Sequence, residues 1–375
     1  MSARLARLRA LLEREGLDGL LIAAPGEEGP GWASRAYLSG FTGSAGVLLV
    51  TRDAAVLAVD SRYWEQADVE TAGRGVAVLR AQGPRSGWLR ELVGNAGAAG
   101  KRIGVAPRDL TYAGFLALEA AVAEMPAGDR PELVPAAGLV EELRRVKDAE
   151  ELALLEEAIR ISDRAFERLA RELAPGMTEL EAADRFERYV REEGGSGVSF
   201  PSIVAGGPWS ALPHAQPRAE GFAPGAPIVI DVGARFRGYC SDLTRTVVLG
   251  EPGARFREVY EVVRAAQLAA IEGVEPGMRA SDAHELAHAV IRAAGYGEAF
   301  GHGLGHGVGL EIHEDPYLGP SSDHVLEAGM VFTIEPGIYL PGWGGVRIED
   351  IVVLEDGKAR VLSHAPKLTL EGSDA

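Results

Sequence analysis

The chain of 375 residues is 46% hydrophobic and 25% charged, which are ordinary values for a globular protein with a sizeable core. Its length exceeds that of most single domains, so two domains are expected. A formal net charge of −17, from 55 acidic and 38 basic residues, opposes binding to nucleic acid and to anionic membrane surfaces.

Three further features indicate the cellular compartment. Cys240 is the one cysteine, so it cannot form a disulfide within the chain. Residues 1–25 lack the apolar core of a signal peptide, and no apolar run is long enough to span a bilayer. These features predict a cytoplasmic protein that has no membrane partner.

The first part of the chain mixes predicted helices and strands. Leucines recur at helical spacing from Leu5 to Leu12, and Gly16 stands where such a helix would end. Further strands are expected at residues 19–23, 47–51, 54–59, 76–79 and 103–106, and further helices at 88–93 and 112–123. Because prolines then break the pattern, we expect an α/β domain over residues 1–138.

The second part, residues 139–375, combines long helices with strands. Helices are predicted at residues 148–173, 178–193, 254–274 and 281–294, and the second of these opens with a capping-box pair, Thr178 and Glu181. Strands are predicted at residues 228–232, 243–247, 331–334, 346–354 and 359–362. We expect this part to form the second domain.

Histidines and glycines gather between Phe300 and Pro316, in FGHGLGHGVGLEIHEDP. The stretch holds three of the eight histidines, namely His302, His306 and His313. Glycines at alternate positions from 301 to 309 leave the backbone free of Cβ atoms, so the chain could approach a ligand closely or adopt positive φ. Because histidine near neutral pH serves as a metal ligand or a proton carrier, the stretch is typical of a functional site.

Two aspartates lie on a predicted hairpin. The β-rich runs 228–232 and 243–247 flank residues 233–238, which have the composition of a hairpin connection. Folding this hairpin about its middle sets Asp231 opposite Asp242, with Cβ atoms about 4.5–5.5 Å apart. Two like charges at that distance need a cation between them, and a divalent metal ion fits. The alternative is that one aspartate ends a strand and the other caps a turn.

Two glutamates occupy comparable places. Glu335 ends the run 331–334 and is followed by proline and glycine, which leave its carboxylate at the edge of a strand. Glu349 lies in an alternating strand, where period two puts it on the same face as Arg347. A carboxylate that faces inward from this otherwise apolar strand needs a cationic partner.

These four carboxylates and one imidazole form a candidate dinuclear metal site. Their four negative charges would balance two divalent ions, with His306 as a neutral fifth ligand. Oxygen ligands with one imidazole and no thiolate favour manganese, with cobalt or zinc as alternatives. Two such ions, about 3.5–4 Å apart, can activate water and polarise a carbonyl or phosphoryl oxygen.

Sequence motifs around these residues carry a resemblance to a known family. They are SALPH at 210–214, GHGLGHGVGLEIHEDP at 301–316 and EPGIYLPGWGGVRIED at 335–350, with YLSGFTGSAG at 37–46 and DSRYWEQA at 60–67 in the first part. With the five ligand residues, they resemble the pita-bread metallopeptidases of the aminopeptidase P and prolidase branch over nearly the whole chain. The resemblance implies an N-terminal creatinase-like α/β domain, residues 1–138, followed by a C-terminal pita-bread α+β catalytic domain, residues 139–375.

The resemblance also implies a role for each site residue. Asp231 would chelate one ion, Asp242 and Glu349 would bridge, and His306 and Glu335 would hold the second ion. Glu335 also matches the family's proton shuttle. His214 and His313 match histidines that steady the substrate carbonyl and the tetrahedral intermediate. His302 and Arg347 match residues of the substrate pocket, with a purely structural contact as the alternative for both.

A second metal motif competes with this site. His284 and His288 fit the HExxH pattern of zinc peptidases, one turn apart on a predicted helix. The apolar residues of that helix leave both histidines on a flank that we expect to be solvated, and no third ligand follows in a recognised motif. Cys240 is expected to be a packing residue, with a soft metal ligand as the alternative. Trp209 could wall the substrate pocket or fill a loop.

By resemblance, the function is that of a dinuclear metal-dependent Xaa-Pro peptidase acting on proline-containing peptides. The same resemblance implies a homodimer whose first domain limits access to the site. The short connection 339–346 favours aminopeptidase P over an Xaa-Pro dipeptidase (prolidase), because a dipeptidase must block the space beyond proline. A non-catalytic binding protein on the same scaffold is disfavoured because all five ligand residues are present.

Overall fold

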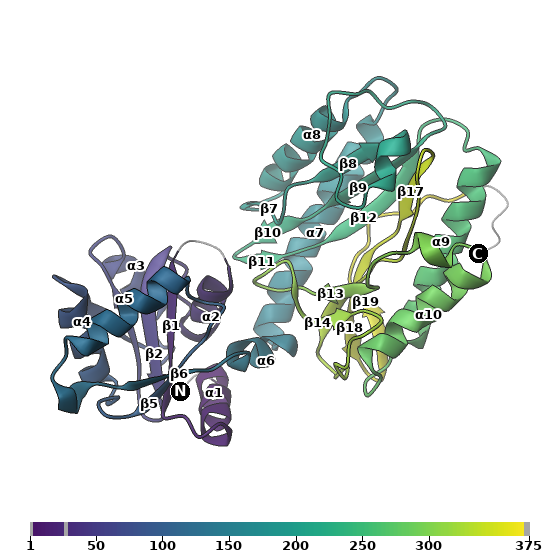
Figure 1. The fold of residues 1–375 in the computed structure, drawn as a ribbon. Helices are drawn as coiled ribbons and strands as arrows, with labels where there is room; N and C mark the ends of the chain where they lie inside the picture. Colours follow the sequence, from purple (N-terminus) through teal and green to yellow (C-terminus); the bar gives the residue numbers. More distant parts are fainter. Residues whose placement is uncertain (1–2, 26–28, 371–375) are drawn as a thin grey trace. The chain divides into compact units, whose positions relative to one another are not determined.

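The computed structural model describes residues 3–25 and 29–370 (Figure 1). The chain divides into two compact units, Met1–Arg144 and Arg145–Ala375. The division falls later than residue 138, where the sequence placed it, because α6 (Leu139–Arg145) is bonded to the first unit. The Leu143 carbonyl accepts hydrogen bonds from Arg7 Nη2 at 3.1 Å and from the Tyr37 hydroxyl at 3.3 Å.

The first unit is built on a six-stranded sheet in the order β4-β3-β2-β1-β5-β6. The strands are β1 (Gly19–Pro25), β2 (Ala45–Thr51), β3 (Ala55–Val59), β4 (Ala77–Arg80), β5 (Arg102–Val105) and β6 (Glu132–Pro135). The helices are α1 (Ala3–Arg14), α2 (Pro30–Ser39), α3 (Trp64–Glu70), α4 (Arg85–Asn95) and α5 (Tyr112–Ala123), with a 3-10 turn at Ala127–Asp129.

Strand β2 runs against the other five strands of this sheet. It pairs antiparallel with β1 and β3, whereas β1 with β5, β5 with β6, and β3 with β4 are parallel pairs. The carboxyl ends of five strands therefore meet at one edge. The sequence predicted an α/β unit with most of these elements but missed α2, α3 and β6. Strand β6 was hidden by its prolines, which are tolerated because it lies at the edge of the sheet.

The second unit has four smaller sheets within the described residues, ordered β11-β10-β7, β12-β9-β8, β14-β13-β15-β18-β19 and β16-β17. Its first strands are β7 (Gly197–Val198), β8 (Ile203–Gly206), β9 (Pro227–Val232), β10 (Ala234–Phe236), β11 (Tyr239–Cys240) and β12 (Leu243–Val248). The later strands are β13 (Gly305–Gly307), β14 (Glu314–Leu318), β15 (Val331–Ile334), β16 (Gly337–Leu340), β17 (Gly344–Arg347), β18 (Asp350–Glu355) and β19 (Lys358–Val361).

The helices of this unit are α7 (Ala149–Glu172), α8 (Glu179–Glu192), α9 (Ala254–Gly273) and α10 (Ala280–Ala293), with 3-10 turns at Gly207–Ala211 and Gly297–Ala299. Capping boxes at Asp148 and Thr178 start α7 and α8, as the sequence predicted for α8. No helix in the described part of the chain is both long and apolar enough to cross a membrane.

Two apolar cores fix the strands that carry the site. Phe166 of α7 and Phe186 of α8 belong to a buried cluster with Ile230 of β9. A second buried cluster joins Tyr260 of α9 to Phe332 of β15. Each strand end that leads to a candidate site residue is therefore anchored by side chains that are out of contact with water.

The predicted hairpin has a different register from the one expected. Strand β12 pairs antiparallel with β9, with Thr244 opposite Asp231. Between them, β10 and β11 form a smaller hairpin closed at Arg237 and Gly238, where φ is 48° and 90°, as a type I′ turn requires. The expectation that Asp242 lies directly opposite Asp231 is therefore wrong. Asp242 precedes Thr244 by two residues, which makes it a diagonal neighbour of Asp231.

The predicted strand 346–354 is interrupted. Strand β17 ends at Arg347 and β18 begins at Asp350. Between them the Glu349 N–H donates to the Thr244 carbonyl at 3.1 Å, so this residue leaves the ladder and contacts β12. The period-two argument for a shared face is therefore wrong, although the Arg347 and Glu349 side chains are both buried.

Some of the alternating glycines of residues 301–309 allow neighbouring strands of the protein to approach closely, instead of a ligand. None of these five described residues has a positive φ. A Cβ on Gly305 would lie 2.0 Å from the Thr333 carbonyl oxygen, and one on Gly307 would lie 2.3 Å from the Asp315 carbonyl oxygen. Strand β13 can therefore lie between β14 and β15 only without side chains at these positions. Gly301, by contrast, faces open space.

A buried ion pair holds the loop between β13 and β14. Lys147 Nζ lies 3.3 Å from Glu314 Oε2, and the two side chains are 1% and 5% exposed. The other oxygen of Glu314 accepts the Glu311 backbone N–H at 3.0 Å. This carboxylate therefore fixes the turn that leads to His313.

We expect Gly305→Ala to lower the free energy of unfolding of the second unit by about 3 kcal/mol, because the added methyl group would overlap backbone atoms of β15. Gly301→Ala in the same loop is the matched control and should leave stability unchanged. Chemical denaturation followed by circular dichroism measures both. Equal stability of the two variants would contradict the close approach of β13 and β15.

Lys147→Met should lower the free energy of unfolding by about 3 kcal/mol, because it removes the cation that pairs with the buried Glu314 carboxylate. It should also lower kcat, since the loop that carries His313 loses its anchor. The double variant Lys147→Met with Glu314→Gln keeps an acceptor for the Glu311 N–H and should recover stability. A single variant as stable as the unaltered protein would show that the pair does not hold the loop.

Candidate metal centre

A cavity of about 850 Å³ in the second unit brings the predicted site residues together. Its lining includes all nine residues that the resemblance assigned to the metal and substrate site: Asp231, Asp242, His306, Glu335, Glu349, His214, His302, His313 and Arg347. Their segments lie far apart along the chain. The cavity is the candidate active site.

The five candidate ligands come from the ends or margins of strands. Asp231 lies in β9, and Asp242 directly precedes β12. His306 lies in β13, Glu335 directly follows β15, and Glu349 lies between β17 and β18. The four carboxylates each adjoin an apolar residue that is buried in one of the two cores, so these side chains are held by rigid neighbours.

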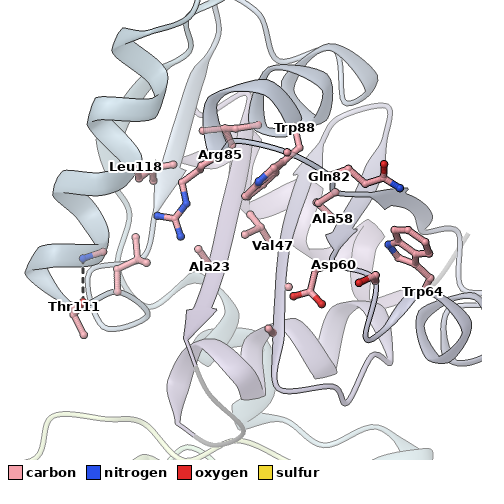
Figure 2. A pocket seen from close by; sticks show the side chains of 18 residues that line it. Ala23, Val47, Ala58, Asp60, Trp64, Gln82, Arg85, Trp88, Thr111 and Leu118 are labelled. Atoms are coloured by element: carbon pink, nitrogen blue, oxygen red, sulfur yellow. Dashed lines mark hydrogen bonds between the residues drawn. The ribbon is translucent and has the colours of Figure 1, made fainter.

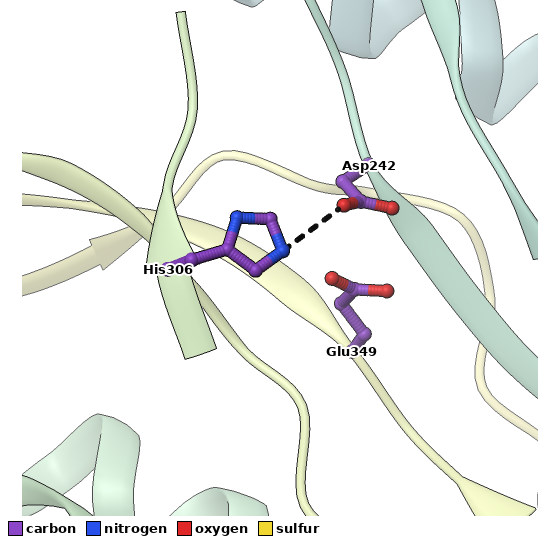
Figure 3. Close-up of side chains that lie close together, drawn as sticks. All are labelled: Asp242, His306 and Glu349. Atoms are coloured by element: carbon purple, nitrogen blue, oxygen red, sulfur yellow. Dashed lines mark ion pairs between the residues drawn. The ribbon is translucent and has the colours of Figure 1, made fainter. Parts of the chain in front are cut away.

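Asp242, His306 and Glu349 form the tightest group (Figure 3). Each offers one ligand atom, and these atoms all lie within 4.8 Å of one another. His306 Nε2 lies 3.5 Å from Asp242 Oδ2 and 3.4 Å from Glu335 Oε1. The carboxylates of Asp242 and Glu349 face the imidazole, as ligands of a shared ion would.

The protonation of His306 is consistent with a metal ligand. Its Nδ1 lies 3.0 Å from the Gly307 carbonyl oxygen and must donate a hydrogen to it, so Nε2 carries a lone pair. Burial lowers the pKa of this imidazole, which keeps it neutral. When the two carboxylates that it faces are ionised, this lone pair has no attractive partner among them, and a cation between these atoms would satisfy all three groups.

The carboxylates, like the His306 lone pair, lack a positively charged or hydrogen-bonding partner at several of their oxygens. Three of their oxygens, Asp231 Oδ1, Asp242 Oδ1 and Glu349 Oε1, are buried without a hydrogen-bond partner. Burial, and then the neighbouring carboxylates, raise the pKa values of Asp242 and Glu349. Burial raises the pKa of Glu335 to about 7. Because orphaned buried oxygens are costly, this set of donors fits divalent cations.

Arg347 is the one permanently charged cation in the lining of this cavity. Its Nη2 lies 2.5 Å from Asp231 Oδ2, and its Nη1 donates to the Tyr339 hydroxyl at 2.7 Å. Its Nε donates to the Thr244 hydroxyl at 3.1 Å, which in turn donates to Glu349 at 2.7 Å. With this one positive charge, four ionised carboxylates and two divalent ions would leave a net charge of +1. The exact charge balance expected from the sequence omitted Arg347, and one further anionic ligand would bring the net charge to zero.

The remaining histidines line the cavity in different states. His302 is engaged at both nitrogens, Nδ1 with the Gly303 carbonyl at 2.8 Å and Nε2 with the Tyr339 hydroxyl at 3.0 Å. Burial lowers the pKa of His302 to about 4. The His313 ring meets that of His306 edge to face at 4.3 Å. His214 and His313 are exposed, so their ring nitrogens can reach a bound molecule.

The HExxH motif does not form a metal cluster within the described residues. His284 is 5% exposed, so the expectation that both of its histidines are solvated is wrong. Its ring stacks on Phe300 at 5.3 Å, and that aromatic contact was not visible in the helical pattern. His288 lies 3.2 Å from Glu285.

Two open questions from the sequence receive structural answers. Cys240 is fully buried, and its N–H donates to the Gly309 carbonyl at 2.7 Å. Trp209 is absent from the lining of the cavity; its indole donates to the Gln216 carbonyl at 3.0 Å, and the Arg218 guanidinium lies over its ring. Cys240 is therefore a packing residue beside Gly309, and Trp209 packs within the loop that contains Gln216 and does not line the substrate cavity.

Three hydroxyl groups that support the site were missed in the sequence. Thr333 accepts the His306 N–H and donates to Glu335, both at 3.0 Å. Thr244 links Arg347 to Glu349, and Tyr339 links Arg347 to His302. The two threonines could have been found from strand periodicity, because each lies two residues from a candidate ligand. Tyr339 carried no such signal.

Comparison with known proteins agrees with this geometry. The family model for metallopeptidase family M24 matches residues 153–356, and the model for the creatinase/prolidase N-terminal domain matches residues 4–146. An Xaa-Pro dipeptidase from Pyrococcus furiosus is 38% identical over 229 residues, which are 61% of this chain and 66% of that protein.

Solved structures are similar over almost the whole chain. An Xaa-Pro dipeptidase from Bacillus anthracis is 38% identical with a TM-score of 0.89, covering 97% of this chain and 98% of that one. An X-Pro aminopeptidase from Thermotoga maritima is 37% identical with a TM-score of 0.87, covering 97% and 99%. The predicted fold, a creatinase-like α/β domain followed by a pita-bread α+β domain, is confirmed. The chain belongs to metallopeptidase family M24 and carries the creatinase/prolidase N-terminal domain.

Proposed function

We propose that this metallopeptidase is a dinuclear Xaa-Pro dipeptidase, which hydrolyses the bond between an N-terminal residue and a C-terminal proline. The observation that carries the metal-dependent part is the convergence of five donor side chains, three of which have a buried carboxylate oxygen without a hydrogen-bond partner. The substrate class is supported by relatives, since the proteins from Pyrococcus furiosus and Bacillus anthracis are named Xaa-Pro dipeptidases.

We propose the following ligands for the two ions. Asp231 would hold one ion, Asp242 and Glu349 would be shared between the two, and His306 and Glu335 would hold the other. The tight group of Asp242, His306 and Glu349 supports the bridging roles. Manganese is the proposed metal, with cobalt or zinc as alternatives, because oxygen donors dominate and thiolates are absent from the lining. When bound, such ions activate water and polarise the scissile carbonyl.

The chain's own residues would perform the remaining steps. Glu335 would accept a proton from the attacking water and pass it to the leaving proline nitrogen. His214 and His313, which are exposed at the cavity, would donate hydrogen bonds to the carbonyl oxygen as negative charge develops there. Arg347 would fix Asp231, because its guanidinium is already engaged with that carboxylate and with Tyr339.

Proline needs a dedicated pocket because its amide nitrogen carries no hydrogen and its ring fixes φ near −65°. The cavity offers apolar and aromatic surface for such a ring in Phe200, Ile203 and Tyr317. His302 would contribute the face of its ring, since both of its nitrogens are bonded within the protein. This apolar and aromatic lining supports the proposed selection for proline.

The second candidate is an X-Pro aminopeptidase, the function that the sequence favoured. The hairpin of β16 and β17 has only residues 341–343 between its strands, which gives little bulk to block a longer peptide. The similar protein from Thermotoga maritima also carries that name. Two of the three compared proteins are named dipeptidases, and we therefore place the dipeptidase first.

We also propose that the protein acts as a homodimer in which the first unit limits access to the cavity. The cavity lining comes from the second unit alone, so the first unit is free to serve another purpose. Resemblance to Xaa-Pro peptidases is the support for the dimer.

Asp242→Ala should remove bound metal and abolish hydrolysis, because a bridging carboxylate is lost. His313→Ala should keep the metal while kcat falls by about 10² to 10³, the usual effect of removing a transition-state donor. Elemental analysis of the purified proteins and steady-state kinetics separate the two outcomes. Full metal occupancy in the Asp242 variant, or metal loss in the His313 variant, would reverse the roles proposed for them.

Leu-Pro should be hydrolysed with a much higher kcat/KM than Leu-Ala, and Leu-Pro-Gly should be a poor substrate. Assays with Mn²⁺, Co²⁺ and Zn²⁺ in turn identify the effective metal. Release of leucine from the tripeptide at the rate seen for the dipeptide would establish the aminopeptidase instead. Equal rates on Leu-Pro and Leu-Ala would rule out selection for proline.

A further inference from the structure

We propose that the first unit carries a second binding site, for a small organic carboxylate with an apolar or aromatic body. A hollow of about 740 Å³ opens on its sheet (Figure 2). Every residue that lines the hollow belongs to the first unit, and none of them takes part in the proposed hydrolysis. Its volume is in the range of small-molecule sites, which are about 300 to 1,000 Å³.

The hollow lies where the topology of the sheet favours a ligand. Asp60 directly follows β3, Ala81 directly follows β4, and Thr111 lies in the connection from β5 to α5. These strands are parallel to β1, so their carboxyl ends share one edge. From β1 the chain builds β2, β3 and β4 on one side and then crosses to β5 and β6 on the other. Open α/β sheets bind ligands at such a switch point.

Apolar side chains form the floor and walls. Figure 2 shows Val47 and Ala58 on the sheet, with Trp88 standing over them and Leu118 on the side of α5. Trp64 lines the other end, and both tryptophans are only half-buried. A hydrocarbon or aromatic group in the hollow would cover indole surface that now contacts water, which is favourable.

The polar groups of the hollow have a surplus of donors. Arg85, Gln82 and the indole N–H of Trp88 make no hydrogen bond or ion pair with any described residue. Figure 2 shows the Arg85 guanidinium reaching into the hollow towards the side of Leu118. The one carboxylate present, Asp60, is already bound at both oxygens by Arg62, at 2.9 and 2.8 Å.

A ligand that matches this surface is an anion with hydrogen-bond acceptor atoms. Arg85 is the first residue of α4, an 11-residue helix, so the partial positive charge of the helix N-terminus adds to its own. A carboxylate can accept two parallel hydrogen bonds from a guanidinium, and the apolar body of the same molecule would lie on Trp88 and Val47. The hollow therefore matches a carboxylate joined to an apolar group.

Calorimetric titration of the metal-loaded protein with N-acetyl-L-phenylalanine tests this site. The probe has no free amine, so it is not a substrate, and N-acetyl-L-phenylalaninamide is its uncharged match. We expect the acid to bind, the amide to bind at least tenfold more weakly, and Arg85→Gln to weaken binding of the acid by about tenfold. Arg90→Gln, which removes the same charge from the same helix outside the hollow, should have no effect. Hydrolysis by the Arg85 variant should be unchanged.

Several results would overturn the proposal. Equal binding of acid and amide would show that no carboxylate is recognised, and equal binding by the Arg85 variant would place the probe elsewhere. Competitive inhibition of peptide hydrolysis with a constant equal to the dissociation constant would place it in the catalytic cavity. Absence of binding to the unaltered protein would show that the hollow is not a site for this class of ligand.

Discussion

Four carboxylates that share one buried cavity impose the condition on which the catalytic unit depends. Removing a carboxylate from water disfavours its ionised form, and each neighbour of the same sign adds to that penalty. The lining of the cavity contains one permanent cation, Arg347, and a neutral imidazole, His306, whose lone pair faces the acids. The protein thus leaves most of the compensation to ions from outside. Ions that bind only the folded chain stabilise it by mass action, so the stability of this unit is linked to metal concentration.

Two adjacent acidic residues, Glu349 and Asp350, have different surroundings, and this difference helps to hold Glu349 in place. Glu349 faces the cavity, whereas Asp350 turns away and pairs with buried Arg245 at 2.7 Å, with Gln267 at 3.1 Å and with Lys367 at 2.6 Å. Arg245 also donates to the Glu349 carbonyl. One acid is therefore fully neutralised by the chain and anchors the backbone of the other. Such support is what holds ligand side chains ready before any ion arrives.

The sequence was sufficient for the residues that take part in the site and insufficient for how they are brought together. Residue types and flanking motifs identified nine residues that line the cavity, because chemistry of this kind needs specific side chains. Pairing was harder. The register of β9 and β12 depends on the inserted hairpin of β10 and β11, whose type I′ turn at Arg237 shortens the expected loop. The break between β17 and β18 depends on a long-range bond from Glu349 to Thr244, and local periodicity cannot contain it. The glycines of β13 were expected to make space for a ligand. They instead make space for β15, and the sequence did not indicate this because Thr333 lies far from Gly305 along the chain.

The spread of the proposed ligands along the chain has a consequence for biosynthesis. They extend from Asp231 to Glu349, and the first of them follows a complete α/β unit. Domains fold in order as the ribosome extends the chain, so the first unit can be finished while β9 is still being made. Glu335 and Glu349 emerge last, so the proposed set of five ligands is complete only once both have been made. Metal binding by all five proposed ligands would therefore be a late event in the synthesis of the chain.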